Sequence, residues 1–130
     1  MTNHCAARKL NAARLQAIAI EAAEQSGRLT VPTVEEPLPS LAAALSSWDE
    51  AAPLYVCDER RDAPPLSAVH AAAASADAAP GLLIGPEGGF SAEEFDQLDR
   101  FDFVTRVSLG QNILRAETAA LAACAILTCR

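Results

Sequence analysis

Residues 82–90 read Leu82-Leu83-Ile84-Gly85-Pro86-Glu87-Gly88-Gly89-Phe90, and this stretch decides the fold. Its first three residues are all apolar, which predicts a short central strand over 82–84 that is buried on both faces. Gly85-Pro86 ends the strand, and Gly88-Gly89 accepts a positive φ or lets a ligand approach the backbone closely. Because ligands bind at the carboxyl ends of strands in open α/β sheets, this loop is the first candidate for a site.

A helix is expected directly after this loop. Ser91 is a suitable N-cap residue, and Glu94 follows three positions later, which is the pattern of a capping box. Phe90 and Phe95 occupy the two positions of a hydrophobic staple. The sequence therefore predicts a unit of strand, glycine loop and helix, with the helix over about 92–100.

The composition fits one domain with a modest core. Of the 130 residues, 51% are apolar but only 5% are aromatic, so the core depends on a few Leu, Ile, Val and Phe side chains. The formal charge of −7 argues against nucleic-acid binding by charge alone. The charge is uneven, however, because residues 1–34 carry four basic and two acidic side chains, whereas residues 87–102 carry one basic and six acidic ones. A polyanion should therefore meet the amino-terminal part first.

The cysteine pattern predicts no structural metal. Cys5, Cys57, Cys124 and Cys129 form no C-x-x-C pair, and neither histidine stands at ligand spacing from them. We expect buried thiols in a reducing cytoplasm. The sequence shows no signal peptide and no apolar run near the roughly 20 residues that cross a membrane, so we expect a cytoplasmic protein without membrane contact.

Helical periodicity and short apolar runs alternate along the rest of the chain. Strands are predicted over about 54–57 and 103–107, and helices over about 10–26, 41–47 and from about 119 to 128. The segment over about 66–75 reads as helix or loop. On the first helix, Leu15, Ile18, Ala19 and Ala22 form an apolar stripe. This order predicts an α/β fold in which helices flank a mostly parallel sheet.

Three segments together resemble a known protein family. They are residues 21–28 with Val31-Pro32, residues 83–91, and Leu109-Gly110 with residues 113–119. In this order and spacing they resemble the RsmE-type 16S ribosomal RNA (uracil-N3) methyltransferases of the SPOUT (alpha/beta knot) superfamily. The resemblance covers about residues 10–127, which is most of the chain.

The resemblance implies a fold, a cofactor and partners. The fold would contain a deep trefoil knot near the carboxyl end, which local sequence patterns cannot show. The methyl donor would be S-adenosyl-L-methionine, and the acceptor would be N3 of a uridine in the 16S rRNA of the small ribosomal subunit. The protein would be a homodimer with its site at the subunit interface, and it would need no metal.

The resemblance also assigns a cofactor pocket. Adenine needs an apolar slot and backbone hydrogen bonds, which glycine loops and aliphatic residues provide. The implied cofactor-binding residues are Leu54, Val56, Ile84, Gly85, Pro86, Glu87, Gly88, Gly89, Leu109, Gly110, Ile113 and Leu114.

Three charged residues are the candidates for catalysis. The enzyme has to align a uracil nitrogen with a sulfonium methyl and stabilise the deprotonated base. Within the resembling motifs, Arg115 is the candidate for base contact and Arg28 for phosphate contact. Glu117 would orient Arg115 or accept a proton, and we favour orientation. For Arg28, the alternative is that it only satisfies the carbonyl groups at a helix end.

The sequence also departs from the family pattern. The family carries an amino-terminal RNA-binding barrel and a further first strand and helix, which this sequence lacks, so residues 1–130 are expected to be a single, truncated SPOUT domain. Gln111-Asn112 stands where the family often has a Pro-Arg or Gly-Arg pair. One alternative is a non-catalytic remnant that dimerises and binds the cofactor. Another is a general α/β nucleotide-binding module. For residues 85–89 taken alone, the alternative is a tight strand-to-helix turn without a ligand.

Overall fold

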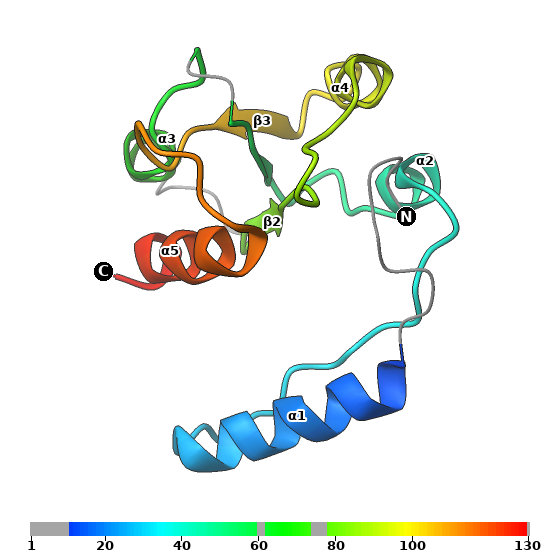
Figure 1. Ribbon diagram of the computed structural model, residues 1–130, viewed down its shortest axis with the longest axis vertical. Helices are drawn as coiled ribbons and strands as arrows, with labels where there is room; N and C mark the ends of the chain where they lie inside the picture. The colour runs from blue at the N-terminus through cyan, green and yellow to red at the C-terminus, as the bar shows by residue number, and fades with distance from the viewer. Residues whose placement is uncertain (1–10, 60–61, 74–77, 130) are drawn as a thin grey trace.

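The computed structural model describes residues 11–59, 62–73 and 78–129. Its elements in chain order are α1 (Ala12–Gln25), α2 (Leu41–Ser46), β1 (Leu54–Cys57), α3 (Leu66–Ala72), β2 (Gly81–Leu83), α4 (Ala92–Leu98), β3 (Val104–Val107) and α5 (Ala116–Thr128). The three strands form one parallel sheet in the order β2-β1-β3. The predicted α/β class, with helices flanking a parallel sheet, is confirmed (Figure 1).

The central strand β1 separates two hydrophobic clusters. Leu54 and Val56 pack with α2 and α4 on one face of the sheet. Tyr55, which pairs with Leu82 of β2 and Thr105 of β3, packs with α3 and α5 on the other face. Figure 1 shows this layering, with the sheet between the pair α3 and α5 and the pair α2 and α4. Burying each large apolar side chain contributes about 1.5–3 kcal/mol, so both faces of β1 stabilise the sheet.

The two crossover connections explain why α3 and α4 lie on opposite faces. The connection β1–α3–β2 runs toward one edge of the sheet, whereas β2–α4–β3 runs back past β1 to the other edge. Crossovers between parallel strands are almost always right-handed. Two right-handed crossovers that run in opposite directions must place their helices on opposite faces.

The prediction for the strand before the glycine loop was partly wrong. Strand β2 covers Gly81–Leu83 rather than 82–84, and it is half-buried rather than buried on both faces. It also lies at the edge of the sheet, while β1 is central. A continuous apolar run does not distinguish an edge strand from a central one, because the difference depends on which strands pair. Gly81 is closely covered by the indole ring of Trp48, which leaves no room for a Cβ atom.

The helix ends follow the predicted capping chemistry. In α4, the Ser91 hydroxyl accepts from the Glu94 N–H, and the Glu94 carboxylate accepts from the Ser91 N–H. The rings of Phe90 and Phe95 lie 5.6 Å apart, which confirms the staple. Helix α1 ends before Gly27, whose φ of 65° suits glycine.

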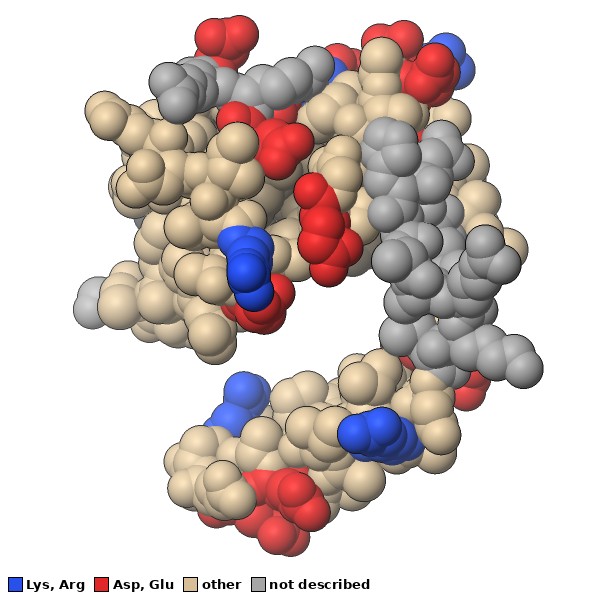
Figure 2. Space-filling view, in the orientation of Figure 1, with Lys and Arg blue, Asp and Glu red and all other residues tan. Residues whose placement is uncertain are grey.

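Helix α1 lies apart from the layered unit (Figure 1). Its predicted apolar stripe is largely exposed, with Leu15 at 40% and Ile18 at 51% of full exposure. The side-chain amide of Gln16 donates to Pro32 O and accepts from Val34 N–H, which holds the following segment against the helix. Figure 2 shows a broad hollow between α1 and the layered unit.

The cysteine expectation needs correction. Cys124 and Cys129 are exposed on or just after α5, whereas Cys57 is half-buried and packs against the cluster around Tyr55. The inward side of α5 is formed by Ala119, Ala123, Ile126 and Leu127, and Cys124 is not part of it. Cys5 lies outside the described residues. In the part of the chain that the structure describes, no helix is long and apolar enough to cross a membrane.

Candidate functional site

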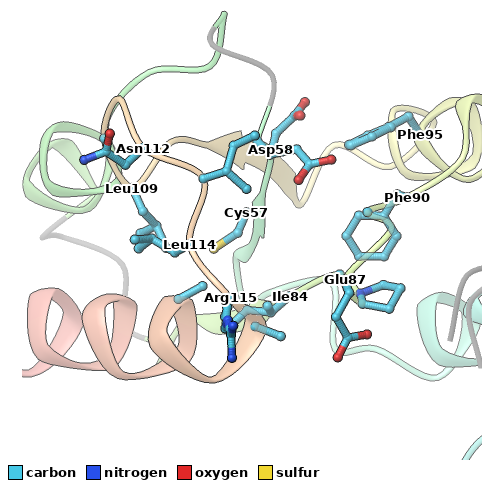
Figure 3. A pocket seen from close by; sticks show the side chains of 18 residues that line it. Cys57, Asp58, Ile84, Glu87, Phe90, Phe95, Leu109, Asn112, Leu114 and Arg115 are labelled. Carbon is cyan, nitrogen blue, oxygen red and sulfur yellow. The ribbon is translucent and has the colours of Figure 1, made fainter. Parts of the chain in front are cut away.

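A cavity of about 220 Å³ opens at the carboxyl ends of the three strands (Figure 3). It begins where β1 ends, and its walls come from the loop after β2, the loop after β3 and the first turn of α5. The lining residues are Cys57, Asp58, Glu59, Ile84, Gly85, Pro86, Glu87, Gly89, Phe90, Phe95, Leu109, Gly110, Asn112, Ile113, Leu114, Arg115, Ala116 and Ala119. Two loops that are separate in the sequence therefore meet in one site, at the edge where α/β sheets bind ligands.

The first wall is the glycine loop after β2, and its backbone packs tightly. Gly89 has a φ of 66°, and a Cβ atom there would come within 2.6 Å of Glu59 Oε1. A Cβ atom at Gly85 would lie 3.1 Å from the Phe90 ring. The Gly89 N–H donates to Pro86 O at 2.8 Å, which closes the turn. The positive φ favours glycine at position 89, and a Cβ atom there would also displace the Glu59 carboxylate from the cavity wall.

The second wall is the loop after β3, which Ser108 fixes. The Ser108 hydroxyl donates to Gly110 O and accepts from Gly110 N–H, at 3.2 and 3.1 Å. The backbone of Ser108 also bonds to Pro64 O and Leu66 N–H. Gly110 has a φ of 125°, which turns the chain so that Leu109 and Leu114 both line the cavity.

The cavity combines an apolar interior with a charged rim. Figure 3 shows the aliphatic side chains of Leu109 and Leu114 on one side and Phe90 on the other. Among the described residues, the lining carries the carboxylates of Asp58, Glu59 and Glu87 and the guanidinium of Arg115, and Asp58 is paired with Arg106. With apolar surface for a flat group and the carboxylates of Glu59 and Glu87, this part of the lining fits a ligand that carries an apolar ring and a cationic centre.

Cys57 lies in the cavity but is not suited to be a nucleophile. Burial raises the pKa of its thiol to about 11. At neutral pH the thiol is therefore protonated, whereas the thiolate is the reactive form. In the cavity Cys57 acts as a small, weakly polar wall residue.

Most of the predicted cofactor-binding residues do line this cavity. The structure brings together Ile84, Gly85, Pro86, Glu87, Gly89, Leu109, Gly110, Ile113 and Leu114. Leu54 and Val56 do not line it, because their side chains point into the core beneath α2 and α4. Gly88 belongs to the loop but is not a lining residue.

Of the three predicted catalytic residues, the structure places only Arg115 at the cavity. Arg115 lies at the rim, and Figure 3 shows its side chain and that of Glu87 extending on the same side of the cavity. Its guanidinium has no hydrogen-bond or ion-pair partner among the described residues. Glu117 and Arg28 are exposed and do not line the cavity. Among the described residues no ion pair joins Glu117 to Arg115, so its orienting role stays a prediction.

The resemblance also implies that the end of the strand over 54–57 borders the pocket, and Cys57 does line the cavity. Sequence reasoning missed seven lining residues, which are Asp58, Glu59, Phe90, Phe95, Asn112, Ala116 and Ala119. The first two follow directly after β1, so the rule that sites form at strand ends identifies them once β1 is known to be central. Asn112 stands at the position where the sequence departs from the family pattern, and it is exposed at the mouth of the cavity.

Comparisons with known proteins agree with this geometry. A family model described as an RNA methyltransferase domain matches residues 1–128. The ribosomal RNA small subunit methyltransferase E of Rickettsia conorii is 34% identical over 96% of this chain and 50% of its own length. The probable rRNA-methyltransferase of Porphyromonas gingivalis has a TM-score of 0.80 at 30% identity, over 96% of this chain and 51% of that one.

A further similar structure contains the implied cofactor. It is the ribosomal RNA small subunit methyltransferase E of Neisseria gonorrhoeae bound to S-adenosyl methionine, with a TM-score of 0.76 at 31% identity, over 95% of this chain and 52% of that one. The chain thus spans about half the length of the relatives it matches. Because the family model matches nearly the whole chain and similar proteins bear the corresponding name, the chain belongs to the RsmE-type family of ribosomal RNA methyltransferases.

Proposed function

We propose that the cavity at the strand ends binds S-adenosyl-L-methionine and that the chain transfers its methyl group to N3 of a uridine in 16S rRNA. The observation that carries this proposal is the meeting of the two glycine-bearing loops, after β2 and after β3, in one cavity. The structure of the Neisseria gonorrhoeae relative with S-adenosyl methionine supports the choice of donor.

The residues of the cavity fit this donor. Ile84, Leu109 and Leu114 offer aliphatic surface for adenine. Space is available beside Gly110, where a Cβ atom would meet nothing within 4 Å. The donor is cationic at sulfur, and the carboxylates of Glu59 and Glu87 in the described part of the lining favour a cation.

In this proposal the chain works by positioning and by electrostatics. The bound donor supplies an electrophilic methyl group on a sulfonium centre. The two loops fix that centre, so that an incoming base needs only to align its nitrogen along the line of displacement. Arg115, whose guanidinium has no partner among the described residues, would donate hydrogen bonds to a uracil oxygen and stabilise the deprotonated base. Arg28 and Glu117 stay proposals for phosphate contact and for the orientation of Arg115.

The RNA and subunit partners belong to the same proposal. Residues 1–34 carry four basic and two acidic side chains, so this part of the chain is the proposed RNA-contacting side. The exposed apolar stripe of α1 supports the proposal that a second copy of the chain covers it in a homodimer. The trefoil knot stays a prediction, and the contact of α3 with α5 beneath the two loops is compatible with it.

Transfer of a labelled methyl group tests the function. The chain is incubated with methyl-labelled S-adenosylmethionine and small ribosomal subunits that lack the modification, and the digested RNA is analysed for 3-methyluridine. We expect incorporation that Arg115→Gln reduces by about 10²-fold or more, because an interaction made in the transition state is lost. Arg100→Gln, an exposed arginine at the end of α4, is the matched control and should leave the rate unchanged.

Two outcomes would contradict this proposal. Tight donor binding without transfer to any ribosomal RNA would favour the non-catalytic alternative. Stronger binding of ATP or a dinucleotide than of S-adenosylmethionine would favour a general nucleotide-binding module.

A further inference from the structure

Arg106 of β3 joins three elements next to the cavity. Its guanidinium forms an ion pair with Asp99, the C-cap residue of α4, through both Nε and Nη2. It also contacts Asp58 Oδ2, just after β1, at 3.4 Å. The guanidinium carbon lies 4.2 Å from the centre of the Phe95 ring, which is within the range of a cation–π interaction.

Two of these partners line the cavity, whereas Arg106 does not. Asp58 and Phe95 are both lining residues; Asp58 directly follows β1, and Phe95 belongs to α4. The Asp58 side chain is only 4% exposed, so its carboxylate is fixed in a largely water-free position. Arg106 therefore lies behind the wall that Asp58 and Phe95 form.

We propose that Arg106 is a positioning residue for the methyl donor, which holds Asp58 and Phe95 in place as one wall of the pocket. This assignment rests on the proposed function of the cavity. It goes beyond the two glycine loops, because it adds Arg106 of β3 and Phe95 of α4 to the residues on which donor binding depends.

The chemistry of the arginine explains why the wall depends on it. A planar guanidinium can bond to Asp99 with one edge, reach Asp58 with another nitrogen and stack its face on an aromatic ring. Lysine carries the same charge at a single point and cannot make all three contacts at once. Without the guanidinium, the buried carboxylate of Asp58 loses a cation at 3.4 Å, and the Phe95 ring loses the group that covers it. Both lining side chains then lose one of the contacts that position them, which weakens the binding of a ligand that touches them.

Calorimetric titration of the full chain with S-adenosylmethionine tests the assignment. We expect Arg106→Gln to raise the Kd about tenfold, since it removes a charge-assisted contact and a cation–π contact behind the wall. Arg106→Lys should fall between this variant and the wild type. Arg100→Gln removes the same charge from an exposed position near the end of α4 and should change the Kd less than about twofold.

A double variant of Arg106 and Asp58 shows whether Arg106 positions Asp58 or only stabilises the fold. If Arg106 acts in part through Asp58, the loss in donor affinity caused by Arg106→Gln should be smaller in an Asp58→Asn background than in the wild type. If the double variant loses as much donor affinity as the two single variants together, Arg106 does not act through Asp58. A general loss of stability would give such additive losses. In the transfer assay Arg106→Gln should raise the KM for the donor and leave kcat nearly unchanged, because Arg106 does not line the cavity.

The remaining outcomes are distinct. Circular dichroism first establishes that each variant is folded, and if Arg106→Gln is not, then Arg106→Lys and Asp58→Asn decide the question. A folded wild type that does not bind the donor overturns the proposed function and this assignment with it. A wild type that binds, together with a folded Arg106→Gln variant that binds equally well, overturns the assignment of Arg106 alone.

Discussion

Single glycines shape the first wall of the cavity. Gly27 and Gly89 have nearly the same φ, 65° and 66°, but a Cβ atom would meet nothing at Gly27 and the Glu59 carboxylate at Gly89. Alanine substitutions at these two positions therefore share the cost of the left-handed backbone conformation, but only the substitution at Gly89 also affects the cavity. Glu59 has a flexible side chain, so a methyl group at position 89 displaces it rather than the backbone.

We therefore expect Gly27→Ala and Gly89→Ala to lower the free energy of unfolding by similar amounts, about 1–2 kcal/mol each, the cost of a left-handed conformation for a residue with a Cβ atom. Only Gly89→Ala should also weaken the binding of S-adenosylmethionine, because it moves a lining carboxylate. Urea denaturation and calorimetry measure the two effects. Equal donor affinity in both variants would show that Glu59 does not contribute to the pocket.

The three described cysteines should react at different rates. Cys124 and Cys129 are exposed, whereas burial raises the pKa of Cys57 to about 11. With iodoacetamide near pH 8, Cys57 should be alkylated last, and its rate should rise about tenfold per pH unit below its pKa, as the thiolate fraction does. Mass spectrometry of the labelled peptides gives each rate.

The same labelling reports on the cavity. Because Cys57 is a lining residue, saturating S-adenosylmethionine should slow its alkylation and leave Cys124 unaffected. Equal protection of both thiols, or protection of neither, would argue against donor binding next to Cys57.

Among the elements, α4 shows how far local patterns specify structure. The capping box and the staple depend on residues three to five positions apart, so the sequence determines them directly. The edge position of β2 and the pairing of all three strands depend on the whole chain, and the apolar run Leu82 to Ile84 contains no sign of them. Local signals thus predicted which segments form helices and strands, with ends shifted by one to three residues at β2 and α5, but not the order of the strands in the sheet.

The capping box should contribute measurably to stability. Ser91→Ala removes the hydroxyl that accepts from the Glu94 N–H and should lower the free energy of unfolding by about 1 kcal/mol. Ser67→Ala, at an exposed position inside α3, is the control and should be neutral or slightly stabilising, since alanine favours helix. Thermal denaturation compares the two variants. A loss at Ser67 as large as that at Ser91 would contradict the capping assignment.

At the scale of the whole molecule, the candidate site was predictable in part. Both glycine loops and Arg115 were found because their motifs are contiguous in the sequence. Asp58 and Phe95 were missed, because they join the cavity only through the central position of β1 and the docking of α4. Leu54 and Val56 were assigned to the cofactor, yet they fill the core, since alternate residues of one strand face opposite sides of the sheet.

The exposed stripe on α1 predicts an assembly of more than one chain. Ile18 is 51% exposed at the centre of this stripe, so Ile18→Glu should shift the population toward the monomer in sedimentation velocity measurements. Arg14→Gln makes the same change in net charge at an exposed position at the start of α1 and is the control. A wild-type chain that is monomeric at all concentrations would contradict the homodimer proposal.

The central claim is that the loops after β2 and β3 together form the binding site of the methyl donor. The most direct test is calorimetric titration of the chain and two leucine variants with S-adenosylmethionine. Leu114 lines the cavity, whereas Leu121 is 74% exposed on α5 and does not. We predict saturable binding to the wild type and to Leu121→Ala, and about tenfold weaker binding to Leu114→Ala, which loses apolar contact with the ligand. No saturable binding by the folded wild type, or equal binding by both variants, would contradict the account.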